Sequence, residues 1–366
     1  METIAFARGV PSPDALPVDA LREAADRALR ADGRRILSYG TGGGYPPLRE
    51  LIAAWHGVSP AQVAVTTGSL QGFVFLVQLL LDDAAAGVAP GVVVENPTYD
   101  RPLLLLRRLG ANVHQVNMTG TGIDIDELEA TFERERPTLL YVIPNFQNPS
   151  GATLDEAGRV RILELAVRHG VTVLEDDPYG ELHFETPVPA SMFSRRGDTD
   201  VIYTSSFSKT ISPGLRVGYM VLPTRLAARF EKLANDTYIS PSLLGQATVC
   251  EFIDAGLLPA NIDRCRGMLQ ERCDAMCTAL DEHLPDATYL RPGGGYFLWA
   301  GLAGGVDAEA LLPIASQHGV SFVPGSAFGR NQGNALRLAF SYPSVDEVGE
   351  GVRRLAEALR STLANA

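Results

Sequence analysis

The chain of 366 residues is 46% hydrophobic and 20% charged, a composition typical of globular proteins and a length sufficient for two lobes with a sizeable core. Its formal net charge of −12, without any run of lysine and arginine, argues against a nucleic-acid partner, because phosphate binding needs a basic patch. No stretch approaches the ~20 apolar residues of a membrane span or has the pattern of a signal peptide, so we expect a cytoplasmic protein with no membrane partner.

From about Ala61, short runs rich in valine and isoleucine alternate with helix-length segments. Such runs, with little alternation of polar residues, are typical of a mostly parallel sheet covered on both faces, an α/β doubly wound lobe. The segment between two of these runs, 82–91, reads as a surface loop. The expected strands are 62–67, 91–96, 138–144, 171–177, 201–207 and 218–223, with helices over 69–81, 101–110 and 155–170.

After Pro223 the pattern changes to long helices. A helix is expected over 260–284, where apolar residues recur at intervals of three and four. The segments 290–302, 320–329 and 335–342 and a final helix read as a small α+β lobe, against which the residues before about Arg35 pack. The cysteines lie at irregular spacing without histidine partners, which predicts buried thiols in a reducing compartment rather than a zinc site or disulfides. They are Cys250, Cys265, Cys273 and Cys277.

Ligands of doubly wound sheets bind at the carboxyl ends of the strands, so the loops after the strands are the places to look for chemistry. Gly68, Ser69 and Leu70 lie between an expected strand and an expected helix, where free backbone N–H groups favour a phosphate. Taken alone, this loop is equally well explained by an ordinary N-cap serine after a turn glycine.

Two further strand ends carry polar side chains. Asn148 follows the strand 138–144, and Glu175, Asp176 and Asp177 end the strand 171–177. A carboxylate there costs several kcal/mol to desolvate unless a cation or a strong donor meets it. A helix cap or a Mg²⁺ pair made by the two aspartates are alternatives, but a metal needs more convergent carboxylates than the other strand ends supply, so we expect no metal. A protonated ring nitrogen on a cofactor is the better match.

A single lysine, Lys209, follows the strand 201–207, between the hydroxyls of Ser206 and Ser208 and a Gly-Leu-Arg that ends at Arg216. A surface lysine would leave these flanking residues without a purpose. Together with the other strand-end loops, this stretch carries a resemblance to a known family. The matching segments, in chain order, are ENPTYD, PNFQNPSG, EDDPYGEL, SSFSKTISPGLRVG, RPGGGYFLW and ALRLAFS.

In that order and over nearly the whole chain, these segments resemble fold-type I pyridoxal-5′-phosphate (PLP) aminotransferases of class I/II. The chain is most similar to the subgroup that holds 2-aminoadipate aminotransferases and the aminotransferase domain of MocR-type regulators. The resemblance implies a doubly wound, mostly parallel sheet in a large PLP-binding domain, 36–235, and a smaller α+β domain formed by 1–35 and 236–366.

The resemblance also implies roles for residues around the cofactor ring. Lys209 matches the lysine that binds PLP as a Schiff base and then moves the α-proton of the substrate. Asp176 would pair with the pyridinium nitrogen and keep it protonated. Asn148 and Tyr179 would hydrogen-bond the ring oxygen O3′, and Tyr99 would stack on the ring face. Taken singly, Tyr99 is also explained as an ordinary turn residue.

A second group of matches concerns the phosphate and the substrate. Arg337 matches the arginine that binds the substrate α-carboxylate, with Asn148 and Gly40 also at the substrate; for Arg337 a structural ion pair is the alternative. Tyr39 matches the position from which this family reaches the neighbouring subunit's phosphate, which implies a homodimer with shared active sites. The phosphate ligands would be Ser69, Leu70, Ser206, Ser208 and Arg216.

The leading hypothesis is a transfer of an α-amino group between an amino acid and a 2-oxo acid by a ping-pong mechanism. Elimination, cyclisation, decarboxylation or oxidation of an amino acid on the same scaffold is the alternative, because the scaffold specifies PLP better than the fate of the carbanion. A non-catalytic PLP-sensing regulator is a third reading, which the acidic charge disfavours. Relatives usually carry another helix before the segment FARGVP, in which Arg8 replaces a small residue; we expect Arg8 at the surface, while contact with an acidic substrate is the alternative.

Overall fold

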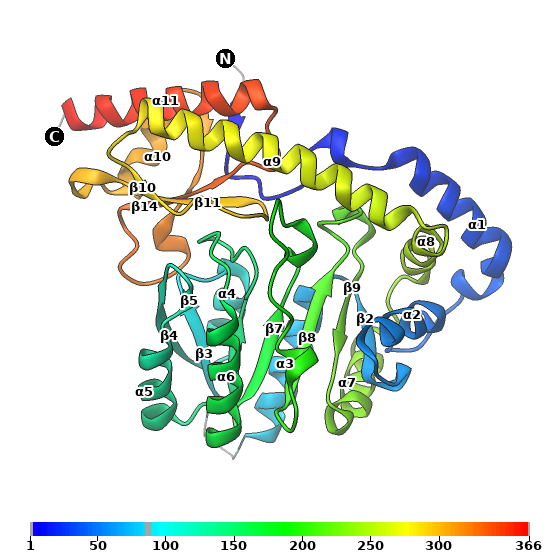
Figure 1. The fold of residues 1–366 in the computed structure, drawn as a ribbon. Helices are drawn as coiled ribbons and strands as arrows, with labels where there is room; N and C mark the ends of the chain where they lie inside the picture. Colours follow the sequence, from blue (N-terminus) through cyan, green and yellow to red (C-terminus); the bar gives the residue numbers. More distant parts are fainter. Residues whose placement is uncertain (1–2, 85–88, 365–366) are drawn as a thin grey trace.

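The computed structural model describes residues 3–84 and 89–364, and an eight-stranded sheet lies at its centre (Figure 1). The strand order is β2-β9-β8-β7-β6-β3-β4-β5. The five neighbours from β8 to β4 run parallel, whereas β9 is antiparallel to both β2 and β8, and β5 is antiparallel to β4. The strands are β2 (Val63–Thr66), β3 (Gly91–Asn96), β4 (Asn112–Thr119), β5 (Gly122–Ile123), β6 (Leu139–Val142), β7 (Thr172–Asp176), β8 (Val201–Ser206) and β9 (Gly218–Val221).

The mostly parallel, doubly wound sheet predicted from the sequence is confirmed, because its central strands are buried on both faces. In β6, Leu139 and Tyr141 belong to one hydrophobic core and Leu140 and Val142 to the other. The first core includes residues of α3 (Ser69–Asp83), α4 (Asp100–Arg108) and α7 (Thr224–Tyr238). The second includes residues of α1 (Val18–Ile36), α2 (Pro46–His56), α5 (Ile125–Glu135), α6 (Glu156–His169) and α8 (Leu243–Asp254).

Local sequence signals explain where these helices begin and end. The carboxylate of Asp155 accepts a hydrogen bond from the backbone N–H of Gly158 at 2.7 Å and caps the start of α6. Gly170 ends the same helix in the left-handed conformation. The predicted loop 82–91 begins two residues later than expected, since α3 continues to Asp83, and residues 85–88 of this prediction lie outside the described residues.

The smaller part of the molecule lies over the carboxyl ends of the parallel strands. The predicted helix 260–284 is α9 (Leu257–His283), which packs beside α11 (Val345–Ala364) across the top of Figure 1. All four cysteines are buried free thiols, as predicted. The remaining elements are α10 (Ala308–Gln317), the antiparallel sheet β10-β11-β14-β13 (Thr288–Tyr289, Phe297–Gly301, Ala335–Ala339, Val323–Pro324), and β1 (Ile4–Ala5) paired with β12 (Val320–Ser321).

Among the residues that the structure describes, no helix is long and apolar enough to cross a membrane. The same residues contain no cluster of three or more histidine, cysteine, aspartate or glutamate side chains placed to hold a metal ion.

Candidate active site

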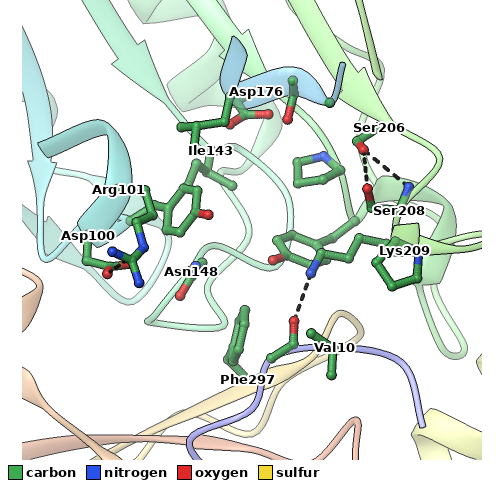
Figure 2. A pocket seen from close by; sticks show the side chains of 18 of the residues that line it. Val10, Asp100, Arg101, Ile143, Asn148, Asp176, Ser206, Ser208, Lys209 and Phe297 are labelled. Atoms are coloured by element: carbon green, nitrogen blue, oxygen red, sulfur yellow. Dashed lines mark hydrogen bonds and ion pairs between the residues drawn. The ribbon is translucent and has the colours of Figure 1, made fainter. Parts of the chain in front are cut away.

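A cavity of about 470 Å³ lies where the carboxyl ends of the parallel strands meet the smaller part of the molecule (Figure 2). Every residue to which the sequence resemblance gives a site role lines it, except Tyr39 and Gly40. In Figure 2, Ser206, Ser208 and Lys209 lie on one side, whereas Asp100 and Arg101 lie on the opposite side. The residues brought together are Ser69, Leu70, Tyr99, Asn148, Asp176, Tyr179, Ser206, Ser208, Lys209, Arg216 and Arg337.

Lys209 enters the cavity from the loop between β8 and β9. Its Nζ donates a hydrogen bond to the carbonyl oxygen of Gly9 at 2.8 Å, and the phenol of Tyr296 donates to the Lys209 carbonyl at 3.1 Å. Burial, together with the guanidinium groups of Arg337 and Arg216, lowers the pKa of Lys209 to about 8 against the opposing effect of Asp176. The chain contains one other lysine, Lys232, which is exposed and paired with Asp236. Lys209 is therefore the one lysine that can react with a ligand in this cavity.

Asp176 is the last residue of β7 and is almost completely buried. Its Oδ2 accepts a hydrogen bond from the phenol of Tyr141 at 2.8 Å, whereas its Oδ1 is buried and has no hydrogen-bond partner among the described residues. Burial raises the pKa of Asp176 to about 7, although the Tyr141 hydrogen bond opposes this rise. A buried carboxylate oxygen without a donor is costly, so the cavity is suited to a ligand that brings one.

The two acidic neighbours of Asp176 point elsewhere. Glu175 accepts hydrogen bonds from the backbone N–H groups of Met192 at 3.0 Å and Phe193 at 2.8 Å, on the opposite face of the sheet. Asp177 accepts from the backbone N–H of Gly180 at 2.9 Å and from the phenol of Tyr203 at 3.1 Å. The magnesium pair considered for the two aspartates therefore does not form, because their carboxylates have separate partners.

The hydroxyls and the helix start expected at a phosphate lie together at one end of the cavity. The Oγ of Ser206 donates to the Oγ of Ser208 at 2.8 Å. Gly68 precedes α3 with φ +81°, and a Cβ atom built on it would lie 2.3 Å from the Arg216 guanidinium, so only glycine allows that side chain to approach. The exposed N–H groups at the start of α3 and the charge of Arg216 make this end of the cavity suitable for an anion.

Arg337 lies in β14, with its guanidinium in the cavity wall. Its Nη1 donates to the side-chain oxygen of Asn148 at 3.1 Å and its Nη2 to the carbonyl of Ala7 at 3.0 Å, while its Nε is buried without a partner among the described residues. The guanidinium carbon lies 4.3 Å from the centre of the Phe297 ring. No carboxylate of the described residues forms an ion pair with Arg337, so the structural ion pair considered for it is not observed.

Tyr179 and Tyr99 line the same cavity from different loops. Tyr179 is buried against Tyr296 and Phe297, with ring centres 5.6 and 5.9 Å away. Burial raises the pKa of both cavity tyrosines, that of Tyr99 to about 12, so both phenols stay protonated at neutral pH and can donate hydrogen bonds.

Sequence reasoning missed several residues of the cavity. The N-terminal segment of residues 7–10 contributes backbone oxygens to both Lys209 and Arg337, and Asp100 and Arg101 line the side opposite the hydroxyls. The only sequence signal for residues 7–10 was the motif FARGVP. The only signal for Asp100 and Arg101 was the motif ENPTYD, which ends at Asp100. Arg8 is exposed and packs over the ring of Tyr342 at 4.3 Å, in agreement with its predicted surface position.

Tyr39 and Gly40 lie in the loop between α1 and α2, apart from the cavity lining. Tyr39 is 84% exposed, and the backbone N–H of Gly40 donates to the hydroxyl of Ser240 at 3.1 Å. Within one copy of the chain, neither residue is among the described residues that line the cavity.

The cofactor that the sequence resemblance implies fits these residues. The free Oδ1 of Asp176 matches the N–H of a protonated pyridine ring, and the cradle beside Gly68 and Arg216 matches a phosphate. Lys209 supplies the amine that an aldehyde needs for a covalent link. The donors, the acceptor and the amine occur in one cavity, and no other described residue donates a hydrogen bond to Oδ1 of Asp176.

Comparison with known proteins gives the same result. Residues 2–355 match the family model for aminotransferase class I and II. The chain is 37% identical to 2-aminoadipate transaminase of Thermus thermophilus over 99% of this chain and 91% of the relative. Its fold matches the crystal structure of LysN, an alpha-aminoadipate aminotransferase of the same species complexed with N-(5′-phosphopyridoxyl)-L-leucine, with a TM-score of 0.93 at 36% identity, covering 100% of this chain and 94% of that one.

A more distant relative is YisV of Bacillus subtilis, an uncharacterized HTH-type transcriptional regulator, which is 27% identical over 98% of this chain and 74% of its own length. The subgroup resemblance predicted from the motifs is thereby confirmed, since both an aminoadipate transaminase and regulators of this type are among the relatives. The chain therefore belongs to the aminotransferase class I and II family, as a pyridoxal phosphate-dependent aminotransferase of fold type I.

Proposed function

We propose that this enzyme transfers an α-amino group between an amino acid and a 2-oxo acid by a ping-pong mechanism, with Lys209 as the residue that binds the cofactor covalently. The observation that carries the proposal is the placement of Lys209 Nζ in the same cavity as the free Oδ1 of Asp176 and the guanidinium of Arg337. When bound, PLP supplies an electron-withdrawing ring for the charge left on the substrate α-carbon and a carbon that carries the amino group between the two half-reactions.

Lys209 has two tasks in this proposal. Because its pKa is lowered to about 8, a larger fraction of its amine is unprotonated at neutral pH than for an ordinary lysine, which favours the covalent link. Once the substrate amine has displaced it, Nζ takes the proton from the substrate α-carbon. The free amine of Lys209 donates a hydrogen bond to the Gly9 carbonyl at 2.8 Å, which places Nζ at the cavity wall.

The remaining cavity residues orient the reactants. Arg337 would bind the substrate α-carboxylate, with Asn148 beside it at 3.1 Å, and would thereby orient the hydrogen on the α-carbon toward Lys209. Asp176 Oδ1 would accept a hydrogen bond from the protonated ring nitrogen, Asn148 and Tyr179 would donate hydrogen bonds to the ring oxygen, and Tyr99 would pack on the ring face. The phosphate would be held by three kinds of donor: hydroxyls, backbone N–H groups and a guanidinium. The hydroxyls are those of Ser69, Ser206 and Ser208, the backbone N–H groups are those of Ser69 and Leu70, and the guanidinium is that of Arg216.

The attachment site is tested by borohydride reduction of the PLP-loaded enzyme followed by peptide mapping. We expect the label on Lys209 and none on Lys232, the matched control, which carries an ion pair to Asp236 on the surface. Because the chain holds only these two lysines, the mapping has only two candidate positions. A label on Lys232 alone, or no label on freshly loaded enzyme, contradicts the proposal.

The reaction type is tested by incubating the loaded enzyme with a panel of amino acids and identifying both the product and the final cofactor form by mass spectrometry. Without an acceptor, transamination predicts one half-turnover that yields the matching 2-oxo acid and the amine form of the cofactor. Addition of a 2-oxo acid then restores the aldehyde form. Many turnovers without an acceptor, with ammonia or a cyclised product and the cofactor unchanged, would establish the elimination or cyclisation alternative instead.

A further inference from the structure

Tyr141 lies directly behind the carboxylate that faces the cofactor ring. It is completely buried in β6, where it pairs in register with Leu174 of the parallel strand β7. Asp176 lies two residues beyond Leu174, and side chains two residues apart in a strand share one face of the sheet. Tyr141 and Asp176 are therefore diagonal neighbours on the adjacent strands β6 and β7, and the phenol of Tyr141 donates a hydrogen bond to Oδ2 of Asp176 at 2.8 Å.

This hydrogen bond divides the two carboxylate oxygens of Asp176 into different roles. Oδ2 is engaged by Tyr141, while Oδ1 is buried without a partner among the described residues. The ring of Tyr141 is itself fixed by Phe73 of α3, whose ring centre lies 5.3 Å away at 67°. A carboxylate held at one oxygen by a rigid donor can turn only little, so its other oxygen keeps its direction.

We propose that Tyr141 is a positioning residue for the cofactor: it directs Asp176 Oδ1 toward the ring nitrogen and stabilises the charged carboxylate, which keeps the proton on the ring. The inference rests on the proposed pairing of Asp176 with the ring nitrogen. Tyr141 does not touch the substrate or the reacting atoms in this arrangement. Its effect passes through the carboxylate of Asp176 alone.

The surroundings of Asp176 explain why such a donor is needed. Burial and the charge of Asp177 raise the pKa of Asp176 to about 7, although the Tyr141 hydrogen bond and the charge of Lys209 oppose this rise. Burial, the charge of Asp176 and the hydrogen bond raise the pKa of Tyr141 well above 10, so that the phenol keeps its proton. The other titratable groups that interact with Asp176 are Glu95, Tyr99 and Tyr179, none of which donates a hydrogen bond to it among the described contacts.

Without Tyr141, the proton between the ring nitrogen and Oδ1 is expected to move toward Asp176. The lost donor raises the proton affinity of the carboxylate, so that a neutral ring faces a neutral carboxyl group, and no other atom gains or loses a proton. A neutral ring accepts charge from the substrate less well, which slows proton removal from the α-carbon. Substrate binding through Arg337 is unaffected, because Arg337 lies on another element.

The test compares Tyr141→Phe with the parent enzyme, each loaded with PLP labelled with ¹⁵N in the ring, by NMR across a pH series. We expect the ring-nitrogen signal of Tyr141→Phe to move toward that of an unprotonated ring at a given pH. We also expect about a ten-fold lower kcat with the KM for the amino acid changed less than about two-fold. An unchanged nitrogen signal in a fully loaded Tyr141→Phe enzyme overturns the proposal.

Tyr203→Phe is the matched control. Tyr203 is a buried phenol on β8 that donates to Asp177 Oδ2 at 3.1 Å, so it makes the same kind of bond to the neighbouring carboxylate. Loss of the Tyr203 hydroxyl is expected to lower the free energy of unfolding about as much as Tyr141→Phe does, without moving the ring-nitrogen signal. If Tyr203→Phe moves the signal as far as Tyr141→Phe does, the effect is general loosening of the sheet and the proposal fails.

Two further variants separate the possible failures. If Tyr141→Phe does not fold, 3-fluorotyrosine at position 141 is the substitute, because it keeps the ring and makes the phenol a stronger donor. The proposal then requires a ring-nitrogen signal nearer to that of a protonated ring. An unchanged signal in this variant overturns the proposal. Asp176→Asn tests the underlying pairing. If Asp176→Asn leaves the nitrogen signal unchanged, the pairing with Asp176 is wrong; if it moves the signal and Tyr141→Phe does not, only the role of Tyr141 is wrong.

Discussion

Three consecutive acidic residues at the end of β7 have three different surroundings. Alternation along the strand turns Glu175 to the face covered by α6, where it lies 3.7 Å from the guanidinium of Arg159. Asp176 points into the cavity, and Asp177, just past the strand, is engaged by the Gly180 backbone and the Tyr203 phenol. One residue of register therefore decides which carboxylate a ligand meets.

The first prediction follows from this register. Asp176→Ala is expected to lower kcat/KM by at least about a hundred-fold, because it removes the carboxylate that we propose as the acceptor for the ring nitrogen. Asp177→Ala is expected to lower kcat/KM by less than about ten-fold, since the Asp177 carboxylate accepts a hydrogen bond from the Gly180 backbone in a turn. Steady-state kinetics on saturated enzyme measures both. Equal losses, or the larger loss for Asp177→Ala, would contradict the assignment of Asp176.

The second prediction concerns the pH dependence of cofactor uptake by Lys209. Its pKa is lowered to about 8, so the unprotonated fraction of Nζ rises as the pH passes upward through about 8. The rate at which cofactor-free enzyme takes up PLP should therefore rise about ten-fold between about pH 7 and pH 9. Stopped-flow absorbance measures the rate, with Lys232→Ala as a control that keeps the same profile. A midpoint near that of an ordinary lysine would refute the lowered pKa.

At the residue scale, the sequence was informative wherever a functional group followed a strand. Lys209 and Asp176 were noticed because they follow strands, whereas Arg216 was assigned through the family resemblance, and the structure places all three in one cavity. Tyr141 was not identified, because it looks like any apolar member of a buried strand until its diagonal neighbour is known. Ala7 and Gly9 contribute only backbone oxygens, which no side-chain pattern reveals.

At the scale of elements, the approach of β9 to the start of α3 shapes the phosphate end of the cavity. A Cβ atom built on Gly218 of β9 would lie 2.4 Å from the backbone nitrogen of Ser69 and 2.7 Å from the carbonyl carbon of Gly68. The strand and the helix start can lie this close only with glycine at this position. Any side chain there must push the anion-binding N–H groups out of place.

The third prediction is that Gly218→Ala weakens PLP binding by at least about ten-fold and lowers the free energy of unfolding by about 1–3 kcal/mol, the usual cost of overpacking. The matched control is Gly267→Ala on the exposed face of α9, where an added Cβ meets nothing within 4 Å. This control is expected to raise the free energy of unfolding by about 0.5–1 kcal/mol, because alanine favours a helix. Titration with PLP and denaturant unfolding measure both, and unaltered PLP binding by Gly218→Ala would refute the expectation.

Sequence patterns located the central strands but not β4, which lies next to the edge of the sheet. The buried strands read as continuous apolar runs, whereas β4 (Asn112–Thr119) is a polar, partly exposed strand that pairs with β3 on one side and, over two residues only, with β5 on the other. A strand near the edge that is partly exposed has no need of apolar residues on both faces, so its sequence resembles that of a loop. The short strands β1 and β12 escaped prediction for a different reason, since two residues are too few for any period.

At the scale of the whole molecule, we propose a homodimer in which the loop between α1 and α2 completes the partner's site, and a division into a large domain, 36–235, and a small domain of 1–35 and 236–366. Tyr39 is 84% exposed in one copy and lies apart from the cavity, which supports a role outside its own subunit. Leu37 and Ile239 are also exposed, at 70% and 52%, and give the chain large apolar side chains for a contact between subunits.

The fourth prediction tests this arrangement by complementation. Tyr39→Ala and Lys209→Ala homodimers are each expected to have little activity, and mixing them under conditions of subunit exchange should restore part of it. A mixed dimer would contain one site with both native residues, which sets an upper limit of about a quarter of the parent activity in an equal mixture. If native mass spectrometry shows mixed dimers and activity stays absent, each site is built within one chain.

The hydrogen bonds of the N-terminal segment have a consequence for the order in which the site is completed during synthesis. Arg337 Nη2 donates to the carbonyl of Ala7, 330 residues earlier, and Lys209 Nζ donates to Gly9. A ribosome releases residue 7 long before residue 337, so the carbonyl of Ala7 lacks its Arg337 donor until almost the entire chain has been made. The wall of the cavity that Ala7 and Arg337 form together is therefore completed only when almost the whole chain has been synthesised.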